Sequence, residues 1–266
     1  MLKTEQRNPK TMNIDKMDTV SMLNIINEEN MVAVKAVGNQ TANIAKAVDA
    51  VAAALADGGR LFYVGAGTSG RLGVADAAEC PPTFGVDSGM IVGIIAGGAT
   101  SMVKASEGQE DDANAGMNDL KAYNLCKKDV VMGISAAGGA AYVVSAIKYA
   151  KSLGCVTVGL TSNEGSPVDK ESDISICTDT GAEVVTGSTR MKAGTAQKLV
   201  LNMISTGAMI KNGYVYENMM INLKPSNIKL RKRMIGIVCE IKKCDEAEAE
   251  KLLEMADWSI RKAVEL

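Results

Sequence analysis

The stretch that decides the fold is Tyr63-Val-Gly-Ala-Gly-Thr-Ser-Gly-Arg-Leu72. The apolar run Leu61–Val64 leads into it, and Gly65, Gly67 and Gly70 match the pattern G-x-G-x-x-G. An apolar run, a glycine-rich turn and helix-forming sequence, in this order, predict a buried strand and then a helix whose N-terminus can bind phosphate. The pattern suits two ligand classes, a dinucleotide and a phosphate monoester.

Strands and helices alternate on both sides of this loop. Apolar residues at helical spacing predict helices over 18–37 and 41–57, and Gly58-Gly59 is a suitable C-terminal cap for the second. A long helix is expected over about 189–211. Short apolar runs predict five buried strands: Leu61–Val64, Ile91–Ile95, Val130–Ile134, Val156–Leu160 and Ile174–Cys177. We therefore expect an α/β fold, with a five-stranded parallel sheet flanked by helices.

The end of the second expected strand separates the two ligand classes. A dinucleotide site needs an acidic residue there to bind the ribose, and the chain has Ala96-Gly-Gly-Ala-Thr100 instead. The hydroxyls of Thr68 and Ser69 at a helix start suit a compact phosphate monoester. We therefore predict a sugar-phosphate loop formed by Gly67, Thr68, Ser69 and Gly70. The alternative is a glycine turn that serves only tight packing of the strand against the helix.

Composition excludes several other functions. The chain has 266 residues, is 47% hydrophobic and carries a formal net charge of −2, and its one basic run, Lys229–Arg233, is typical of a solvated helix face. We expect no nucleic-acid partner. The N-terminal stretch is too polar for a signal peptide, and no run of about 18 apolar residues suggests a membrane span. We expect a cytoplasmic protein.

The chain has six cysteines without a C-x-x-C pair and has no histidine. Neither a disulfide framework nor a metal site is indicated, and we expect no cofactor. Without histidine, proton transfer near neutral pH must use carboxylates, Lys, Tyr or Cys.

Two acidic stretches are candidates for that proton transfer. We expect Pro81-Pro82 to end the helix that begins near Ser69, which places Glu79 at its C-terminal end. Glu107–Asp112 is expected to open a helix that runs to about Tyr123, with Glu110 near its start. The helix dipole would raise the pKa of Glu79 and keep Glu110 ionised, so the two could divide into acid and base. The alternative is a pair of solvated helix ends, and the neighbouring Asp111 and Asp112 oppose the effect on Glu110.

A third motif, Gly181-Ala-Glu-Val-Val-Thr-Gly-Ser-Thr-Arg-Met-Lys-Ala-Gly-Thr-Ala-Gln-Lys198, crowds hydroxyls and cations before a helix. Its composition fits an anion-binding helix start, with Ser188 and Thr189 as ligands, or an ordinary capped helix. It also resembles the signature shared by N-acetylmuramic acid 6-phosphate etherases and the glucokinase regulatory protein. The resemblance extends to "TEQRNPKTMNID", "GAGTSGRLG", "AAECPPTFG", "EGQEDD" and "LVLNMIST".

The resemblance implies a sugar isomerase (SIS) domain, a flavodoxin-like fold that dimerises. It would cover about 51–214, with a helical segment over 1–50 and a helical tail over 215–266. It also implies a carbon–oxygen lyase that removes D-lactate from N-acetylmuramic acid 6-phosphate in cell-wall recycling. By motif position, Glu110 would be the base that takes the C2 proton, and Glu79 the acid that protonates the departing lactate.

One loop departs from the family pattern. After the third expected strand the etherases have Ser-Gly-Arg-Thr-Pro, whereas this chain has Ala137, Gly139, Ala140 and Ala141 in place of Ser, Arg, Thr and Pro. Two expected phosphate-binding hydroxyls are missing, and we expect the backbone N–H groups of Gly138 and Gly139 to take their place. Three alternatives to an active etherase stay open: a sugar-phosphate-binding regulator, an inactivated variant and an aldose–ketose isomerase.

Overall fold

The computed structural model describes residues 1–105, 108–225 and 227–266, so Ser106, Glu107 and Ser226 lie outside the described residues. Its centre is a five-stranded sheet in the order β2-β1-β3-β4-β5, in which every neighbouring pair is parallel. The strands are β1 (Leu61–Gly65), β2 (Ile91–Ile95), β3 (Val130–Ile134), β4 (Val156–Thr161) and β5 (Ile174–Cys177). The expected fold class is confirmed, with the strand order of a flavodoxin-like sheet.

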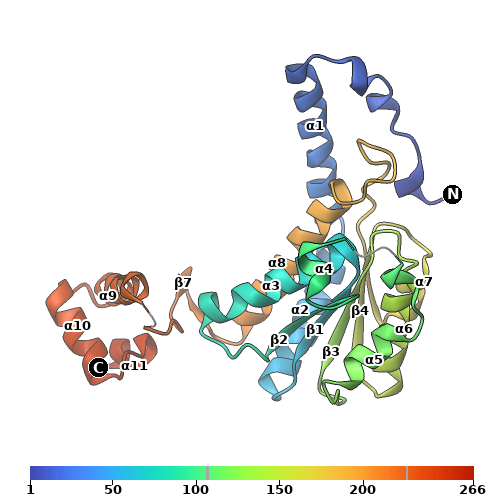
Figure 1. Cartoon of the computed structure of the whole chain (residues 1–266). Coiled ribbons are helices and arrows are strands. Elements are labelled where there is room, and N and C mark those ends of the chain that lie inside the picture. Colours follow the sequence, from blue (N-terminus) through green and yellow to red (C-terminus); the bar gives the residue numbers. More distant parts are fainter. Residues whose placement is uncertain (106–107, 226) are drawn as a thin grey trace.

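Helices cover both faces of the sheet (Figure 1), and the side chains of each strand alternate between these two helical layers. Leu61 and Tyr63 pack in the core that contains residues of α1 (Thr19–Gly38), α2 (Thr41–Ala56), α3 (Gly67–Phe84) and α8 (Lys192–Lys211). Phe62 and Val64 face the opposite core, which is completed by α5 (Ala115–Lys121), α6 (Ala141–Ser152) and α7 (Pro167–Glu171). The short helix α4 (Thr100–Val103) lies beside α3.

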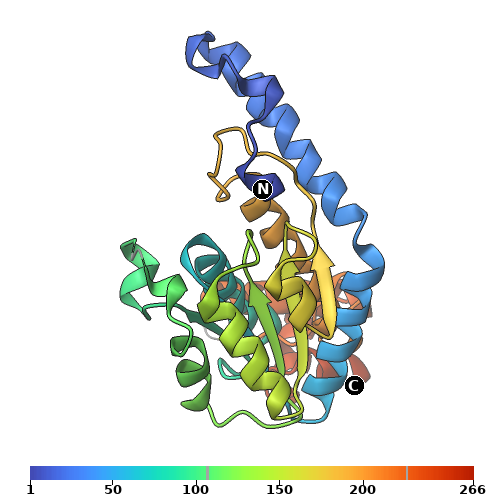
Figure 2. The ribbon, with the colours of Figure 1, turned by 90° about the vertical axis from the view of Figure 1, so that its right-hand side faces the viewer.

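An N-terminal arm extends from the sheet layer. It consists of the 3-10 turns η1 (Lys3–Glu5), η2 (Pro9–Thr11) and η3 (Ile14–Lys16), and then α1, which projects beyond the sheet in Figure 2. Its polar side chains bind the loops after β4 and β5. Asn163 donates to Thr4 Oγ1 at 3.1 Å, and Thr11 Oγ1 donates to the Val184 carbonyl at 2.9 Å. The arm therefore holds the loop that leads into α8.

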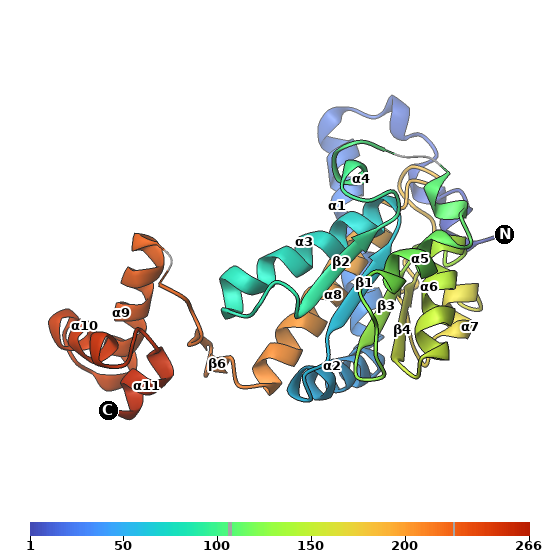
Figure 3. The same ribbon diagram turned by 60° about the horizontal axis from the view of Figure 1, so that its bottom comes forward.

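The C-terminal helices form a cluster with a hydrophobic core of its own. After the short pair β6 (Val215–Tyr216) and β7 (Met219–Met220) come α9 (Ile228–Lys242), α10 (Glu246–Met255) and α11 (Ile260–Glu265). Figure 3 shows this cluster beyond the far ends of α3 and α8, away from the sheet. Asn222 links it to the body by donating to the Phe84 carbonyl at 2.7 Å.

Two expected helix boundaries are wrong. Helix α3 continues through Pro81-Pro82 to Phe84, because the buried side chains of Cys80 and Phe84 hold this last turn on the core and Gly85, at φ 65°, ends the helix. Glu79 therefore lies in the body of the helix.

The helix expected from 107 to 123 is also replaced. The described part is a single 3-10 turn, η4 (Gln109–Asp111), followed by α5, which begins only at Ala115. Asp112 Oδ1 accepts hydrogen bonds from the backbone N–H groups of Asn114 and Ala115, and this turn interrupts the helix. Glu110 consequently has no long helix dipole behind it.

Within the three described ranges, no helix is both long and apolar enough to cross a membrane.

Candidate functional site

The first turn of α3 lies at the carboxyl end of β1 and leaves backbone donors open. Gly70 donates to the Ala66 carbonyl at 3.2 Å, but the N–H groups of Gly67, Thr68 and Ser69 have no acceptor among the described residues. A glycine is needed at position 70, because an added Cβ would lie 2.6 Å from the Gly65 carbonyl oxygen. The close crossing directs the three open N–H groups beyond the edge of the sheet, where an anion can bind.

The loop after β3 forms the facing wall. Ser135 Oγ accepts the Gly138 N–H at 3.1 Å, and the Gly138 carbonyl accepts the Val168 N–H at 3.0 Å. Gly138 has φ 76° and lies so close to Ser166 that no side chain fits. These contacts fix the loop, while the N–H groups of Ala137, Gly139 and Ala140 find no acceptor among the described residues.

The third candidate, the N-terminus of α8, is already capped. The Glu183 carboxylate is fully buried and accepts the N–H groups of Lys192 and Ala193 at 3.0 and 2.9 Å. The capped helix that the sequence allowed is observed at Lys192 and Ala193, and anion binding by Ser188 and Thr189 stays a prediction. Gly194 on α8 approaches Thr68, because an added Cβ would lie 3.5 Å from the Thr68 methyl group. The start of α8 therefore supports the pocket without supplying open N–H groups from Lys192 and Ala193.

These walls enclose a cavity of about 260 Å³. It is lined by Ala66, Gly67, Thr68, Ser69, Glu110, Ile134, Ser135, Ala136, Ala137, Ala140 and Thr189. We call it the loop pocket. Its only charged lining residue, among the described residues, is the exposed Glu110, so a carboxylate stands beside a set of backbone donors.

The structure gathers some of the predicted site residues and separates others. Gly67, Thr68, Ser69, Glu110 and Thr189 all line the loop pocket.

Four others do not line it: Gly70, Gly138, Ser188 and Glu79. Gly70 allows α3 to pack closely against β1, and the Gly138 N–H donates to Ser135 Oγ. The Ser188 N–H donates to the Val185 carbonyl.

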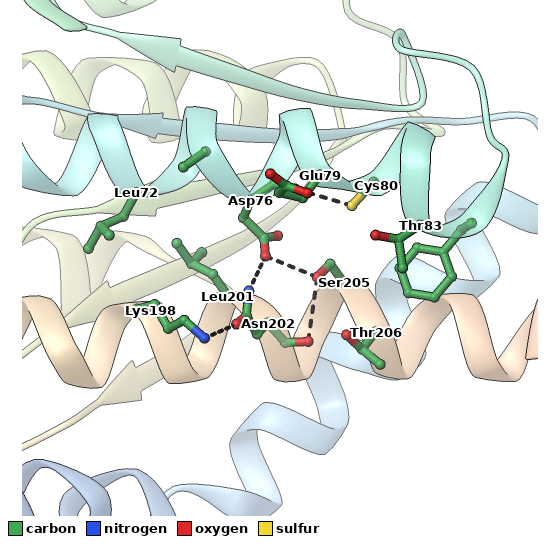
Figure 4. A pocket seen from close by; sticks show the side chains of 12 residues that line it. Leu72, Asp76, Glu79, Cys80, Thr83, Lys198, Leu201, Asn202, Ser205 and Thr206 are labelled. Atoms are coloured by element: carbon green, nitrogen blue, oxygen red, sulfur yellow. Dashed lines mark hydrogen bonds between the residues drawn. The ribbon is translucent and has the colours of Figure 1, made fainter. Parts of the chain in front are cut away.

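Glu79 lines a groove between α3 and α8 (Figure 4). This groove, of about 410 Å³, also contains the buried Asp76, which accepts hydrogen bonds from Tyr63 at 2.9 Å and Ser205 at 3.3 Å and also from Asn202. Burial and the Asp76 charge raise the pKa of Tyr63 well above its usual value and that of Cys80 to about 12. Tyr63 and Cys80 therefore stay protonated at neutral pH, whereas the Glu79 side chain is exposed to solvent.

Three polar residues beside the pocket were not predicted from the sequence. Ser135 lines it directly, Arg71 lines an adjoining cavity, and Gln197 accepts a 3.0 Å hydrogen bond from Ser69 Oγ. Gln197 is almost fully buried, and its Nε2 has no partner among the described residues. Arg71 lies in the first glycine motif and Gln197 in the motif over 181–198. Which way a helical side chain faces, however, depends on the packing of that helix.

Two family models and several known proteins match this chain. The glucokinase regulatory protein N-terminal SIS domain matches residues 43–151, and the SIS domain matches residues 112–206. N-acetylmuramic acid 6-phosphate etherase from Cronobacter sakazakii is 50% identical over 263 residues, which cover 99% of this chain and 89% of that protein. The enzyme of that name from Erwinia tasmaniensis is 48% identical and covers 98% of this chain and 85% of its own length. The one from Salmonella typhi is 49% identical and covers 99% of this chain and 89% of its own length.

The chain belongs to the N-acetylmuramic acid 6-phosphate etherase family. The resemblance inferred from the sequence motifs is thereby confirmed. The N-acetylmuramic acid 6-phosphate etherase relatives match both the SIS core and the helical segments on either side of it, since the alignments span nearly the whole chain.

Solved structures agree with the family at the level of the fold. A phosphoheptose isomerase from Francisella tularensis covers 73% of this chain and all of its own, with a TM-score of 0.55 and 16% identity. A protein from E. coli CFT073 covers 76% of this chain and 97% of its own, with a TM-score of 0.54 and 16% identity. At such low identity, these similarities establish the SIS fold alone.

Proposed function

We propose that this protein is a carbon–oxygen lyase that cleaves the D-lactyl ether of N-acetylmuramic acid 6-phosphate. The products would be N-acetylglucosamine 6-phosphate and D-lactate, as in cell-wall amino-sugar recycling, and we propose that it acts in the cytoplasm. The observation that carries the proposal is the loop pocket, in which one carboxylate, Glu110, lies beside open backbone donors, in a chain about half identical to etherases.

The phosphate would bind between the start of α3 and the loop after β3. We assign the open N–H groups of Gly67, Thr68 and Ser69 to one side of the phosphate, and those of Ala137, Ala140 and the intervening Gly139 to the other. Both sets of backbone N–H groups can bind an anion without the help of a side-chain cation. Thr68, Ser69 and Thr189 are the lining residues whose hydroxyls we assign to the phosphate, and the Ser69 hydroxyl donates to Gln197 in this structure.

Glu110 would act as the base. In the open-chain sugar the C2 proton is adjacent to the aldehyde and is therefore acidic enough for a carboxylate to remove. Glu110 takes this proton, the resulting enolate expels the ether oxygen from C3, and that oxygen takes a proton from the acid. Water then adds to C3 of the unsaturated aldehyde while C2 regains a proton. Atoms balance, because the water replaces the lactate and no redox step occurs.

The acid, Glu79, raises a geometric problem that a second copy would solve. Glu79 lies ten residues beyond Ser69, which is about 15 Å along the axis of α3. It lines a different groove, so the two carboxylates do not share a pocket within one chain. We propose a homodimer in which Glu79 of one copy reaches the Glu110 pocket of the other.

The exposed surface supports such a dimer. Val20, Leu23, Met31 and Val34 of α1 are between 47 and 68% exposed, and their spacing places them on one stripe of the helix. Exposed apolar stripes of this kind mark association surfaces. A partner would also cover Glu110, which is open to solvent in one chain, and so exclude water during the elimination.

The altered loop favours a second candidate, a sugar-phosphate-binding protein without catalysis. Ala137 and Ala140 line the loop pocket where hydroxyls were expected. Two hydrogen bonds to a charged group contribute about 1.5–3 kcal/mol each, so their loss could weaken phosphate binding by on the order of 10²–10⁴. The six open N–H groups favour continued phosphate binding despite this loss, and the presence of Glu110 favours catalysis over binding alone.

Lactate release from N-acetylmuramic acid 6-phosphate tests the proposal. We expect D-lactate from the wild-type protein and a lower KM in the double variant Ala137→Ser/Ala140→Thr. Lactate from the double variant alone would identify an enzyme that the loop has inactivated. If neither protein releases lactate but both bind the sugar phosphate, the etherase proposal is wrong and the binding protein is supported.

A further inference from the structure

A second cavity opens beside the loop pocket. It has a volume of about 230 Å³ and shares Ala66, Gly67 and Glu110 with the loop pocket, so the two cavities meet at the proposed base. Its remaining lining residues are Arg71, Ala96, Ser101, Ala105, Gly108 and Gln109. We call it the side pocket. A ligand with its phosphate in the loop pocket could extend past Glu110 into this space.

Arg71 supplies the positive charge of the side pocket. Its Nε donates to the Met102 carbonyl at 3.1 Å, which orients the guanidinium group from the second turn of α3. Among the described residues, its two terminal nitrogens have no acceptor and no carboxylate lies within ion-pair distance. The side chain is partly buried.

Arg60 shows what a satisfied guanidinium looks like in this chain. It binds the buried Asp129 through two nitrogens and also donates to two backbone carbonyls. Arg71 instead presents a fork of open donors toward a cavity. That geometry matches the two oxygens of a carboxylate.

We propose that Arg71 binds the carboxylate of the lactyl group, so that the side pocket is the site for the 2-hydroxy-acid portion of the substrate. This inference rests on the proposed function. The lactyl ether is attached to C3, the carbon next to the one whose proton Glu110 would remove. Since Glu110 lines both cavities, a sugar with C2 at Glu110 places its C3 substituent at the side pocket. Arg71 is thus a substrate-binding residue that distinguishes the ether from the product sugar.

Two ligands that differ only in the lactyl group test this role. Binding of N-acetylmuramic acid 6-phosphate and of N-acetylglucosamine 6-phosphate is measured by calorimetry with the Glu110→Gln protein, in which turnover is blocked. Adding Arg71→Gln is expected to weaken binding of the lactyl-bearing sugar by about 10- to 100-fold and to leave binding of the product sugar within about threefold. Arg71→Lys, which keeps the charge but loses the fork, should fall between.

The outcomes separate the possible failures. An equal loss for both ligands would mean that Arg71 only holds α4 against α3 and would overturn the inference, as would unchanged binding of both. Binding of neither sugar by the Glu110→Gln parent would overturn the proposed function itself, and this inference with it. Arg233→Gln, at an exposed arginine of α9 outside both cavities, is the matched control and should leave both affinities unchanged.

Discussion

At the residue scale, Ser69 and Gln197 share a hydrogen bond whose direction matters for anion binding. Ser69 donates to Gln197 Oε1, and the buried Nε2 of Gln197 has no partner among the described residues. An unsatisfied buried donor is costly. A half-turn of the amide would let Nε2 donate to Ser69 and release the serine proton for a phosphate oxygen. We therefore interpret Gln197 as the residue that positions the Ser69 hydroxyl.

Gln197→Glu should accordingly weaken sugar-phosphate binding. A carboxylate can only accept, so it would hold the Ser69 proton and add a negative charge near the phosphate. We expect an affinity loss of about 10- to 100-fold, and a smaller loss for Gln197→Leu, in which the serine proton stays free. Calorimetry with N-acetylglucosamine 6-phosphate measures both. Wild-type affinity in the Glu variant would disprove this role.

The position of the first loop at a helix start could be predicted from the sequence, whereas the residues around it could not, and phosphate binding by the loop stays a prediction. Gly67, Thr68 and Ser69 were predictable because a glycine turn at a helix start is a local pattern. Gln197, Arg71 and Ser135 depend on which side chains meet across α3, α8 and β3. That depends on tertiary packing, for which spacing along the chain gives no signal.

At the element scale, the crossing of β1 and α3 sets the position of the phosphate donors. An added Cβ at Gly70 would lie 2.6 Å from both the Gly65 carbonyl oxygen and Ile95 Cγ1, whereas one at Gly139 would meet nothing within 4 Å.

Gly70→Ala should therefore lower the free energy of unfolding by about 1–3 kcal/mol, as overpacking does. Gly139→Ala, the matched control, should change it by less than about 0.5 kcal/mol. Urea denaturation of both variants measures the difference. Equal stability of the two variants would show that β1 and α3 leave room for a side chain at position 70.

A buried ion pair attaches α1 to the start of α8. Glu29 and Lys192 are 3% and 2% exposed, and Glu29 also accepts hydrogen bonds from Asn8 at 2.8 Å and Lys10 at 3.1 Å. Burial alone would raise the pKa of Glu29, but the hydrogen bonds from Lys192, Lys10 and Asn8 outweigh it and lower the pKa below its ordinary 4.5. A carboxylate with a lowered folded-state pKa stabilises the fold above the unfolded value, and that contribution is lost as the pH falls through the folded value.

Glu29→Gln should reduce the free energy of unfolding by about 3–5 kcal/mol at pH 7, because Lys192 is left buried without its partner. The gap to wild type should shrink as the pH falls from 4.5, the ordinary pKa, through the lower pKa of folded Glu29, because the wild-type carboxylate is then protonated as well. Urea titrations at a series of pH values measure this, with the exposed Glu28→Gln as control. A gap that is independent of pH would contradict the assignment.

The elements themselves were largely predictable. Ile91–Ile95, Val130–Ile134 and Ile174–Cys177 were expected with the observed bounds, because strands buried on both faces are short apolar runs. The boundaries at Pro81-Pro82 and at Asp112 were missed. In the first case burial of Phe84 outweighs a local proline preference, and in the second an aspartate side chain competes for backbone donors.

At the scale of the whole molecule, we assign a different role to each of three segments of the chain. We propose that 51–214 is the catalytic SIS unit, that 1–50 supports the loop before α8, and that 215–266 is a separate helical tail. The second of these rests on the contacts of Thr4, Thr11 and Glu29 with that loop and its neighbours. The third rests on the hydrophobic core that the tail has to itself.

The proposed dimer can be tested by complementation. Glu79→Gln and Glu110→Gln proteins, each inactive alone, are mixed, unfolded and refolded together. If the acid and base come from different copies, half of the dimers are mixed and one of their two sites is intact, so about a quarter of the wild-type activity should return. Lactate release measures it. No recovery from a mixture that forms dimers would place both carboxylates in one chain.

The reaction in D₂O tests the central claim, elimination initiated by Glu110, most directly. Wild-type protein with N-acetylmuramic acid 6-phosphate should yield D-lactate and N-acetylglucosamine 6-phosphate that carries deuterium at C2, as NMR detects. Glu110→Gln should neither exchange this proton nor release lactate, whereas Glu79→Gln should still exchange it and release no lactate. Lactate released with the original proton still at C2, or exchange by Glu110→Gln at the wild-type rate, would contradict the account.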